Sequence, residues 1–149
     1  MEDLVSQARW SSRTRIHGSG RPTVLLADDD PAFLYLVGQL LQPRFEVVGM
    51  VEDGQSLLAA ACKLKPDLFV TDISMPGLNG FQAARQLKKK QPNARILLLS
   101  IHEDPAAVTE ALAIGVDGYV VKRRAAFDLI PALLEVYQGG RFVSEGVQE

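Results

Sequence analysis

Short apolar runs alternate with amphipathic segments through most of the chain, and this alternation strongly restricts the possible folds. Residues 23–27, 45–51, 67–72, 95–100 and 118–121 form such runs, as expected of strands buried on both faces. The segments between and after them carry apolar residues at helical spacing, bounded by Pro, Gly or Asp. Five strands alternating with five helices predict an α/β fold. The favoured arrangement is a flavodoxin-like, doubly wound, five-stranded parallel sheet of order 2-1-3-4-5.

The charge pattern divides the 149-residue chain into a tail and one domain. Residues 1–22 hold four Arg and two acidic residues, a net charge of +2, whereas residues 23–149 hold twelve basic and sixteen acidic residues, a net charge of −4. The first stretch has no sustained period and ends in a Gly- and Ser-rich segment. We therefore expect a flexible basic N-terminal tail at 1–22, one domain at 23–140, and a C-terminal linker or tail at 141–149.

Composition argues against several classes of protein. The net charge of −2 argues against direct nucleic-acid binding by this chain, and the one cysteine, Cys62, excludes a disulfide framework. No apolar run is long enough to cross a membrane, and no signal-peptide core lies near the start. These observations predict a cytoplasmic protein without membrane contact.

Acidic, hydroxyl and ammonium groups collect at the carboxyl ends of the predicted strands. These groups belong to Asp28, Asp29, Asp30, Asp72, Ser100 and Lys122. Carboxyl ends of parallel strands meet at one edge of a sheet, where neighbouring carboxylates repel unless a divalent cation such as Mg²⁺ or Mn²⁺ binds them. An ammonium and a hydroxyl can hold phosphate oxygens, so the pattern predicts an aspartate that accepts a phosphoryl group.

These residues and their surroundings resemble the receiver domain of bacterial two-component response regulators. The resemblance covers residues 23–140. It is carried by Asp28-Asp29-Asp30-Pro31, by 66–80 with Asp72 and Gly80, by Leu99-Ser100, and by Gly118-Tyr119 with Lys122. The sequence is similar to the LuxR/NarL kind, in which a helix-turn-helix output domain follows the receiver.

The resemblance implies a role for each site residue. Asp72 is the implied phosphoacceptor. Asp28, Asp29 and Asp72, with the backbone carbonyl of Ser74, are the implied Mg²⁺ ligands. Lys122 and Ser100 are implied to contact the phosphoryl group, and Ser100 and Tyr119 to switch the face formed by the fourth helix, fifth strand and fifth helix.

The same resemblance implies the partners. A sensor histidine kinase or a histidine phosphotransfer protein would donate the phosphoryl group, and a downstream protein or a homodimer would receive the signal. The receiver would assist its own phosphorylation without being a turnover enzyme.

Four positions differ from the family pattern. Ile101 follows the switch serine where a small residue is common, which puts the rates of phosphorylation and dephosphorylation in doubt. Arg123 and Arg124 follow Lys122 and add positive charge beside the site. Asp30 stands where this subgroup often has His, and we expect it to cap the following helix.

Other interpretations stay open at this stage. The chain could be a receiver fragment of a LuxR-type transcription regulator or a phosphorylation-independent interaction module. Asp28-Asp29-Asp30 also resembles the Asp-nucleophile phosphatases, although that leaves Asp72 unexplained. In the last predicted helix, 126–138, we expect Phe127 to point inward.

Overall fold

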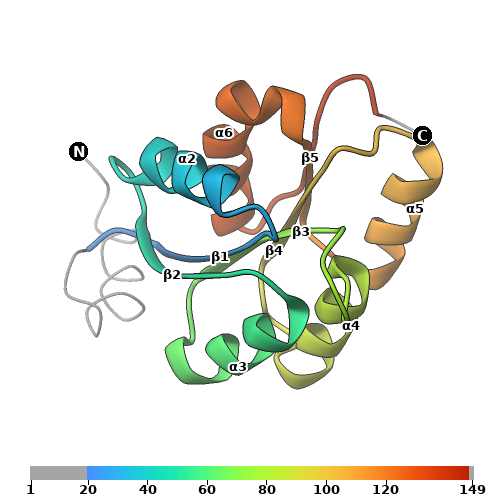
Figure 1. Ribbon diagram of the computed structural model, residues 1–149. Helices are drawn as coiled ribbons and strands as arrows, with labels where there is room; N and C mark the ends of the chain where they lie inside the picture. The colour runs from blue at the N-terminus through green and yellow to red at the C-terminus, as the bar shows by residue number, and fades with distance from the viewer. Residues whose placement is uncertain (1–19, 148–149) are drawn as a thin grey trace.

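The computed structural model describes residues 20–147, in which one parallel sheet lies between two layers of helices (Figure 1). The predicted tail falls outside the described residues except for 20–22. The strands are Thr23–Ala27 (β1), Glu46–Val51 (β2), Leu68–Asp72 (β3), Ile96–Ser100 (β4), Gly118–Val121 (β5) and Phe142–Val143 (β6). The helices are Pro31–Leu41 (α2), Gly54–Leu64 (α3), Gly80–Lys90 (α4), Pro105–Ile114 (α5) and Ala125–Tyr137 (α6), with a 3₁₀ turn at Lys122–Arg124 (η1).

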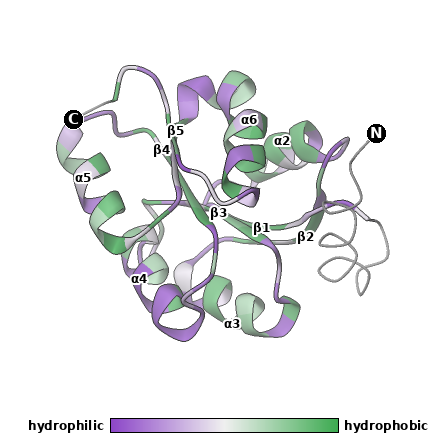
Figure 2. Ribbon diagram, turned by 180° about the vertical axis from the view of Figure 1, so that it is seen from behind, coloured by the Kyte–Doolittle hydropathy of each residue, from purple (hydrophilic) through white to green (hydrophobic). Residues whose placement is uncertain are grey.

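Alternate residues of the central strands enter two apolar cores, one on each face of the sheet. Leu25 of β1 packs in the core beneath α3, α4 and α5, and its neighbour Leu26 packs in the core beneath α2 and α6. Hydrophobic residues accordingly follow the strands through the centre of the molecule (Figure 2). β1, β3 and β4 are buried along their whole length, which explains why the sequence shows continuous apolar runs there.

Polar caps fix where the helices begin. Asp30 accepts hydrogen bonds from the backbone amides of Ala32 and Phe33 at the start of α2, as predicted. Asn79 and Gln82 form a reciprocal capping box at the start of α4. Each cap ends the loop that leaves a strand, so the capped helix starts stand beside the carboxyl edge of the sheet.

The prediction of five strands is wrong, because a sixth strand extends the sheet. The order is β2-β1-β3-β4-β5-β6, and β6 pairs in parallel with β5. The amide of Phe142 donates to the Asp117 carbonyl at 3.1 Å, and the amide of Ser144 donates to the Tyr119 carbonyl at 2.9 Å. A two-residue strand leaves no readable period in a sequence. It forms here because the outer edge of β5 offers unpaired backbone groups.

The prediction for Phe127 is also wrong, since its side chain is 73% exposed. The buried face of α6 is formed by Leu129, Ala132, Leu133 and Val136. Residues two apart in a helix lie on nearly opposite sides, so burial of Leu129 turns Phe127 outward. No helix in the described part of the chain has the length and apolar character needed to cross a membrane.

Candidate functional site

Three carboxylates lie together where β1 and β3 end. The oxygens of Asp28, Asp29 and Asp72 lie within 4.8 Å of one another. β1 and β3 are adjacent in the sheet, with Ala27 opposite Thr71, so the residues after them meet at one edge. Asp28 and Asp72 are buried, whereas Asp29 is exposed. The carboxyl edge of the sheet therefore holds two buried carboxylates and a third that is exposed to solvent.

Lys122 supplies a cation to this cluster. It opens the η1 turn after β5, and its Nζ lies 2.7 Å from Asp28 Oδ2 and 3.5 Å from Asp72 Oδ2. Burial disfavours the charged ammonium, but the Asp28 contact and the Asp72 charge outweigh it, and the pKa of Lys122 is raised. The ring of Phe33 lies 4.5 Å from Nζ, centroid to nitrogen, and supports the cation from the α2 side. Lys122 is thus a fixed positive charge at the site.

The acidic cluster fits a hard divalent cation. Asp28 Oδ1 accepts a hydrogen bond from the Asp30 amide at 2.9 Å, and the buried Asp28 Oδ2 pairs with the Lys122 ammonium at 2.7 Å. Burial and the charge of Asp28 raise the pKa of Asp72, against the lowering effects of Lys122 and the Ser74 backbone. Three carboxylates whose oxygens lie this close together are a donor set that suits Mg²⁺.

The ionisation of Asp72 predicts how stability varies with pH in the metal-free protein. Because its folded pKa is raised, the folded protein holds this proton more tightly than the unfolded chain does. The free energy of unfolding should therefore decrease as pH rises from about 3.8, the ordinary pKa of an aspartate, through the raised pKa of Asp72, and stay lower above it. Asp72→Asn should abolish this decrease and raise the Tm at neutral pH by on the order of a few degrees.

Urea unfolding over a pH series in the presence of a chelator measures this effect. Asp53→Asn is the matched control, because Asp53 caps α3 outside the cluster and asparagine is an equally good cap. Parallel pH curves for wild type and Asp72→Asn would contradict the prediction.

Gly80, for which the sequence predicts no role, contacts the backbone of Asp72 and Ile73 at the end of the loop after β3. The Gly80 amide donates to the Ile73 carbonyl at 2.7 Å. A Cβ at position 80 would overlap with the carbonyl oxygen of Asp72 and the Cα of Ile73. The only signal in the sequence was the glycine directly after the Asn79 cap. Gly80 is required because the start of α4 lies directly against the backbone of the site.

We expect Gly80→Ala to reduce the free energy of unfolding by about 2–4 kcal/mol, because backbone atoms cannot move aside as a flexible side chain can. Chemical denaturation measures the change. Gly38→Ala is the control, since a Cβ there would meet only the flexible end of Met50. An effect at Gly80 no larger than that at Gly38 would contradict the close approach.

Ser100 and Tyr119 are joined through the loop between β4 and α5. The His102 amide donates to Ser100 Oγ at 2.9 Å, and the Tyr119 hydroxyl donates to the His102 carbonyl at 2.9 Å. Both Ser100 and Tyr119 are buried, and burial raises the pKa of the Tyr119 hydroxyl. Ile101 lies between Ser100 and His102 in the loop and is 69% exposed. The backbone of His102, which the sequence did not single out, is therefore the link between the two predicted switch residues.

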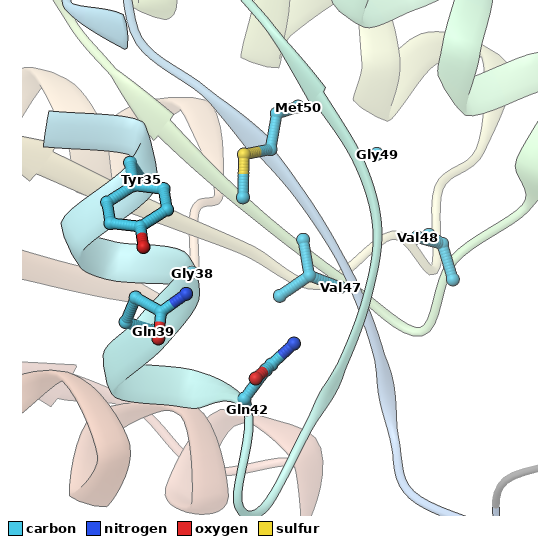
Figure 3. A pocket seen from close by; sticks show the side chains of 8 residues that line it. All are labelled: Tyr35, Gly38, Gln39, Gln42, Val47, Val48, Gly49 and Met50. Carbon is cyan, nitrogen blue, oxygen red and sulfur yellow. The ribbon is translucent and has the colours of Figure 1, made fainter. Parts of the chain in front are cut away.

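A separate groove lies between α2 and β2, away from the acidic cluster (Figure 3). Tyr35 and Gln39 from the helix and Met50 from the strand face it. Among residues 20–147, no acidic, basic or histidine side chain lines this groove, so these residues do not give it the groups that phosphoryl chemistry requires.

Comparison with known proteins identifies the family. Residues 24–134 match the response regulator receiver domain. The chain belongs to this family. As a response regulator receiver it is a signalling module, and its flavodoxin-like fold and acidic cluster are those of the family.

Individual relatives place the receiver near the NarL group. It is 38% identical over 122 residues to the transcriptional regulatory protein DegU of Brevibacillus brevis, covering 80% of this chain and 52% of that protein. It is 35% identical over 127 residues to the nitrate/nitrite response regulator NarL of Escherichia coli K12, covering 84% and 59%. The chain thus spans between half and three fifths of these relatives.

Solved receivers have the same fold. The isolated receiver domain of RcsB from Salmonella enterica serovar Typhimurium, solved with the phosphomimetic BeF3⁻, superposes with a TM-score of 0.79 at 31% identity. The match covers 85% of this chain and 96% of that one. The receiver domain of NarL from Mycobacterium tuberculosis gives 0.76 at 31% identity, covering 80% and 98%.

Proposed function

We propose that this receiver takes a phosphoryl group from a phosphohistidine donor onto Asp72, in a reaction that requires Mg²⁺ or Mn²⁺. The observation that carries the proposal is that the buried Asp72 carboxylate lies 3.5 Å from the Lys122 ammonium and in one carboxylate cluster with Asp28 and Asp29, which suits a divalent cation. An acceptor needs an oxygen nucleophile flanked by cations that stabilise the charge of the transferring group.

In the proposed step, an oxygen of Asp72 bonds to phosphorus as the bond between phosphorus and the donor imidazole nitrogen breaks. The electron pair of the broken bond stays on that nitrogen. Lys122 then pairs with a phosphoryl oxygen, and the Ser100 hydroxyl donates to another. Asp28, Asp29, Asp72 and the Ser74 carbonyl would hold the metal, which lowers the charge repulsion between acceptor and phosphoryl oxygens.

We propose that the donor protein binds along α2. Phe33, Leu36 and Leu40 of this helix line an apolar groove that Ala126 completes and that reaches Lys122. Because Phe33 and Lys122 belong to both the groove and the site, a histidine kinase or phosphotransfer protein in the groove would face Asp72. Leu36 is 62% exposed and is available for such a contact.

Acetyl phosphate, and separately a phosphorylated histidine phosphotransfer protein, test the proposal with intact-mass spectrometry. We expect one phosphoryl group per chain, released by hydroxylamine because an acyl phosphate is formed, and no incorporation when a chelator removes the metal. Absence of incorporation would favour the phosphorylation-independent interaction module. Steady turnover of an excess phosphomonoester would favour an Asp-nucleophile phosphatase.

A second candidate function, as the receiver part of a LuxR-type transcription regulator, is favoured by the names and lengths of the relatives. DegU is described as a transcriptional regulatory protein, and the match covers 52% of it. The reading frame at the 3′ end of the gene tests this candidate. A helix-turn-helix sequence continuing in frame would support it, and a stop codon after Glu149 would favour signalling to a separate protein.

A further inference from the structure

Three consecutive basic residues of the η1 turn contact three different parts of the molecule. Lys122 contacts Asp28 and Asp72 at the acidic cluster. Arg123 makes two hydrogen bonds to Glu103, at 2.7 and 2.8 Å, in the loop between β4 and α5. Arg124 also makes a two-point pair, with a different acid. One short turn therefore connects the site to two other elements.

The partner of Arg124 is Asp128, a buried carboxylate of α6. Arg124 Nε and Nη2 donate to it at 2.9 and 3.1 Å, and the Ser144 hydroxyl donates to its Oδ2 at 2.7 Å. The Arg124 hydrogen bonds lower the pKa of Asp128 despite its burial, so the pair is ionic. Ser144 Oγ also accepts from the Val121 amide at 3.2 Å. We call Arg124, Asp128 and Ser144 the latch.

The latch holds residues 142–147 against β5. Phe142 and Val143 form β6, and the Ser144 amide donates to the Tyr119 carbonyl. Val147 is fully packed in the same apolar core as Tyr119 and Val108 of α5. In Figure 1 this red segment runs back past β5 toward α5. The outer edge of β5, part of the face expected to signal, is thus covered by the chain itself.

We propose that Arg124, Asp128 and Ser144 are positioning residues that couple the docking of 142–147 on β5 to the state of Asp72. The proposal rests on the proposed function. A phosphoryl group on Asp72 gives Lys122 a new partner and draws the η1 turn away from Asp28. A two-point arginine pair tolerates little displacement, so the same shift weakens the Arg124–Asp128 pair and frees the segment.

A second connection works in the same direction. The loop that carries Glu103 also holds the Tyr119 hydroxyl through the His102 carbonyl. When Ser100 turns toward the phosphoryl group, it gives up the His102 amide, and the loop loosens beside both Arg123 and Tyr119. Phosphorylation then exposes the β5 edge through two changes, loosening of the β4–α5 loop and displacement of the η1 turn.

Hydrogen–deuterium exchange of the full chain, with and without Mg²⁺ and beryllofluoride, tests the coupling. In wild type we expect beryllofluoride to speed exchange at 142–147 by roughly tenfold. In Arg124→Ala and Ser144→Ala, exchange there should already be fast without beryllofluoride and should no longer respond to it. The loop between β4 and α5 should still respond in both variants. Arg85→Ala is the control, since its exposed pair with Glu110 lies outside the latch.

The outcomes separate this proposal from the proposed function. A beryllofluoride response in the β4–α5 loop of wild type with none at 142–147 would overturn the coupling alone. Absence of a response anywhere, together with absent phosphorylation, would overturn both. An undiminished beryllofluoride response at 142–147 in both latch variants would also overturn the coupling, because a merely structural latch would change the basal rate without changing the response.

Discussion

Phosphoryl incorporation from acetyl phosphate should fall at least about a hundredfold in Asp72→Asn, to the background of the assay. The amide keeps the shape of the side chain but has no anionic oxygen to attack phosphorus. Its neighbours Asp28 and Asp29 stay in place, so the proposed metal ligands other than Asp72 are retained. Intact-mass spectrometry after incubation with Mg²⁺ measures the loss.

Asp53→Asn is the control for this experiment as well, because it makes the same chemical change at the α3 cap and should be labelled like wild type. Labelling of Asp72→Asn at the wild-type level would assign the acceptor role to another residue. Peptide mapping would then show whether Asp28 or Asp29 carries the group.

The second large effect concerns the metal. The double variant Asp28→Asn, Asp29→Asn should bind Mg²⁺ at least about a hundredfold more weakly, because two of the three clustered carboxylates lose their charge. Asp28 is buried whereas Asp29 is exposed, so replacement of Asp28 should account for most of the loss. Isothermal titration calorimetry measures the affinity directly.

Asp30→Asn separates this effect from a general loss of charge. Asp30 adjoins the cluster but caps α2, and asparagine caps equally well, so Mg²⁺ affinity should stay within a few-fold of wild type. Undiminished Mg²⁺ affinity in the double variant would mean that the metal binds elsewhere than at this edge of the sheet. Because the proposed transfer needs the metal, the double variant should also lose labelling.

The covered β5 edge changes how signalling by this receiver is understood. The resemblance to receiver domains predicts that a face formed by the fourth helix, fifth strand and fifth helix meets a partner. In the structure, residues 142–147 already occupy the strand edge of that face, with Ser144 buried against Asp128. Under the proposed coupling, a partner gains access to β5 only when this segment leaves.

The partners of the two basic residues after Lys122 could not be predicted from the sequence. Arg123 and Arg124 suggested extra positive charge at the site, but their guanidinium groups pair with Glu103 and Asp128 instead. Neither the direction of a side chain on a turn nor its partner follows from adjacency in sequence. Glu103 is twenty residues from Arg123, and only the packing of the β4–α5 loop against the turn brings them together.

The sequence alone was enough to predict the parallel sheet, most of its strands, the Asp30 cap and the gathering of Asp28, Asp29 and Asp72. It could do so because apolar periodicity is local and because parallel strands place all their carboxyl ends at one edge. Tertiary structure alone decided the sixth strand, the outward position of Phe127, the need for glycine at position 80 and the latch on Ser144. These features depend on backbone edges and buried partners contributed by distant segments, whose packing leaves no periodic signal in the chain.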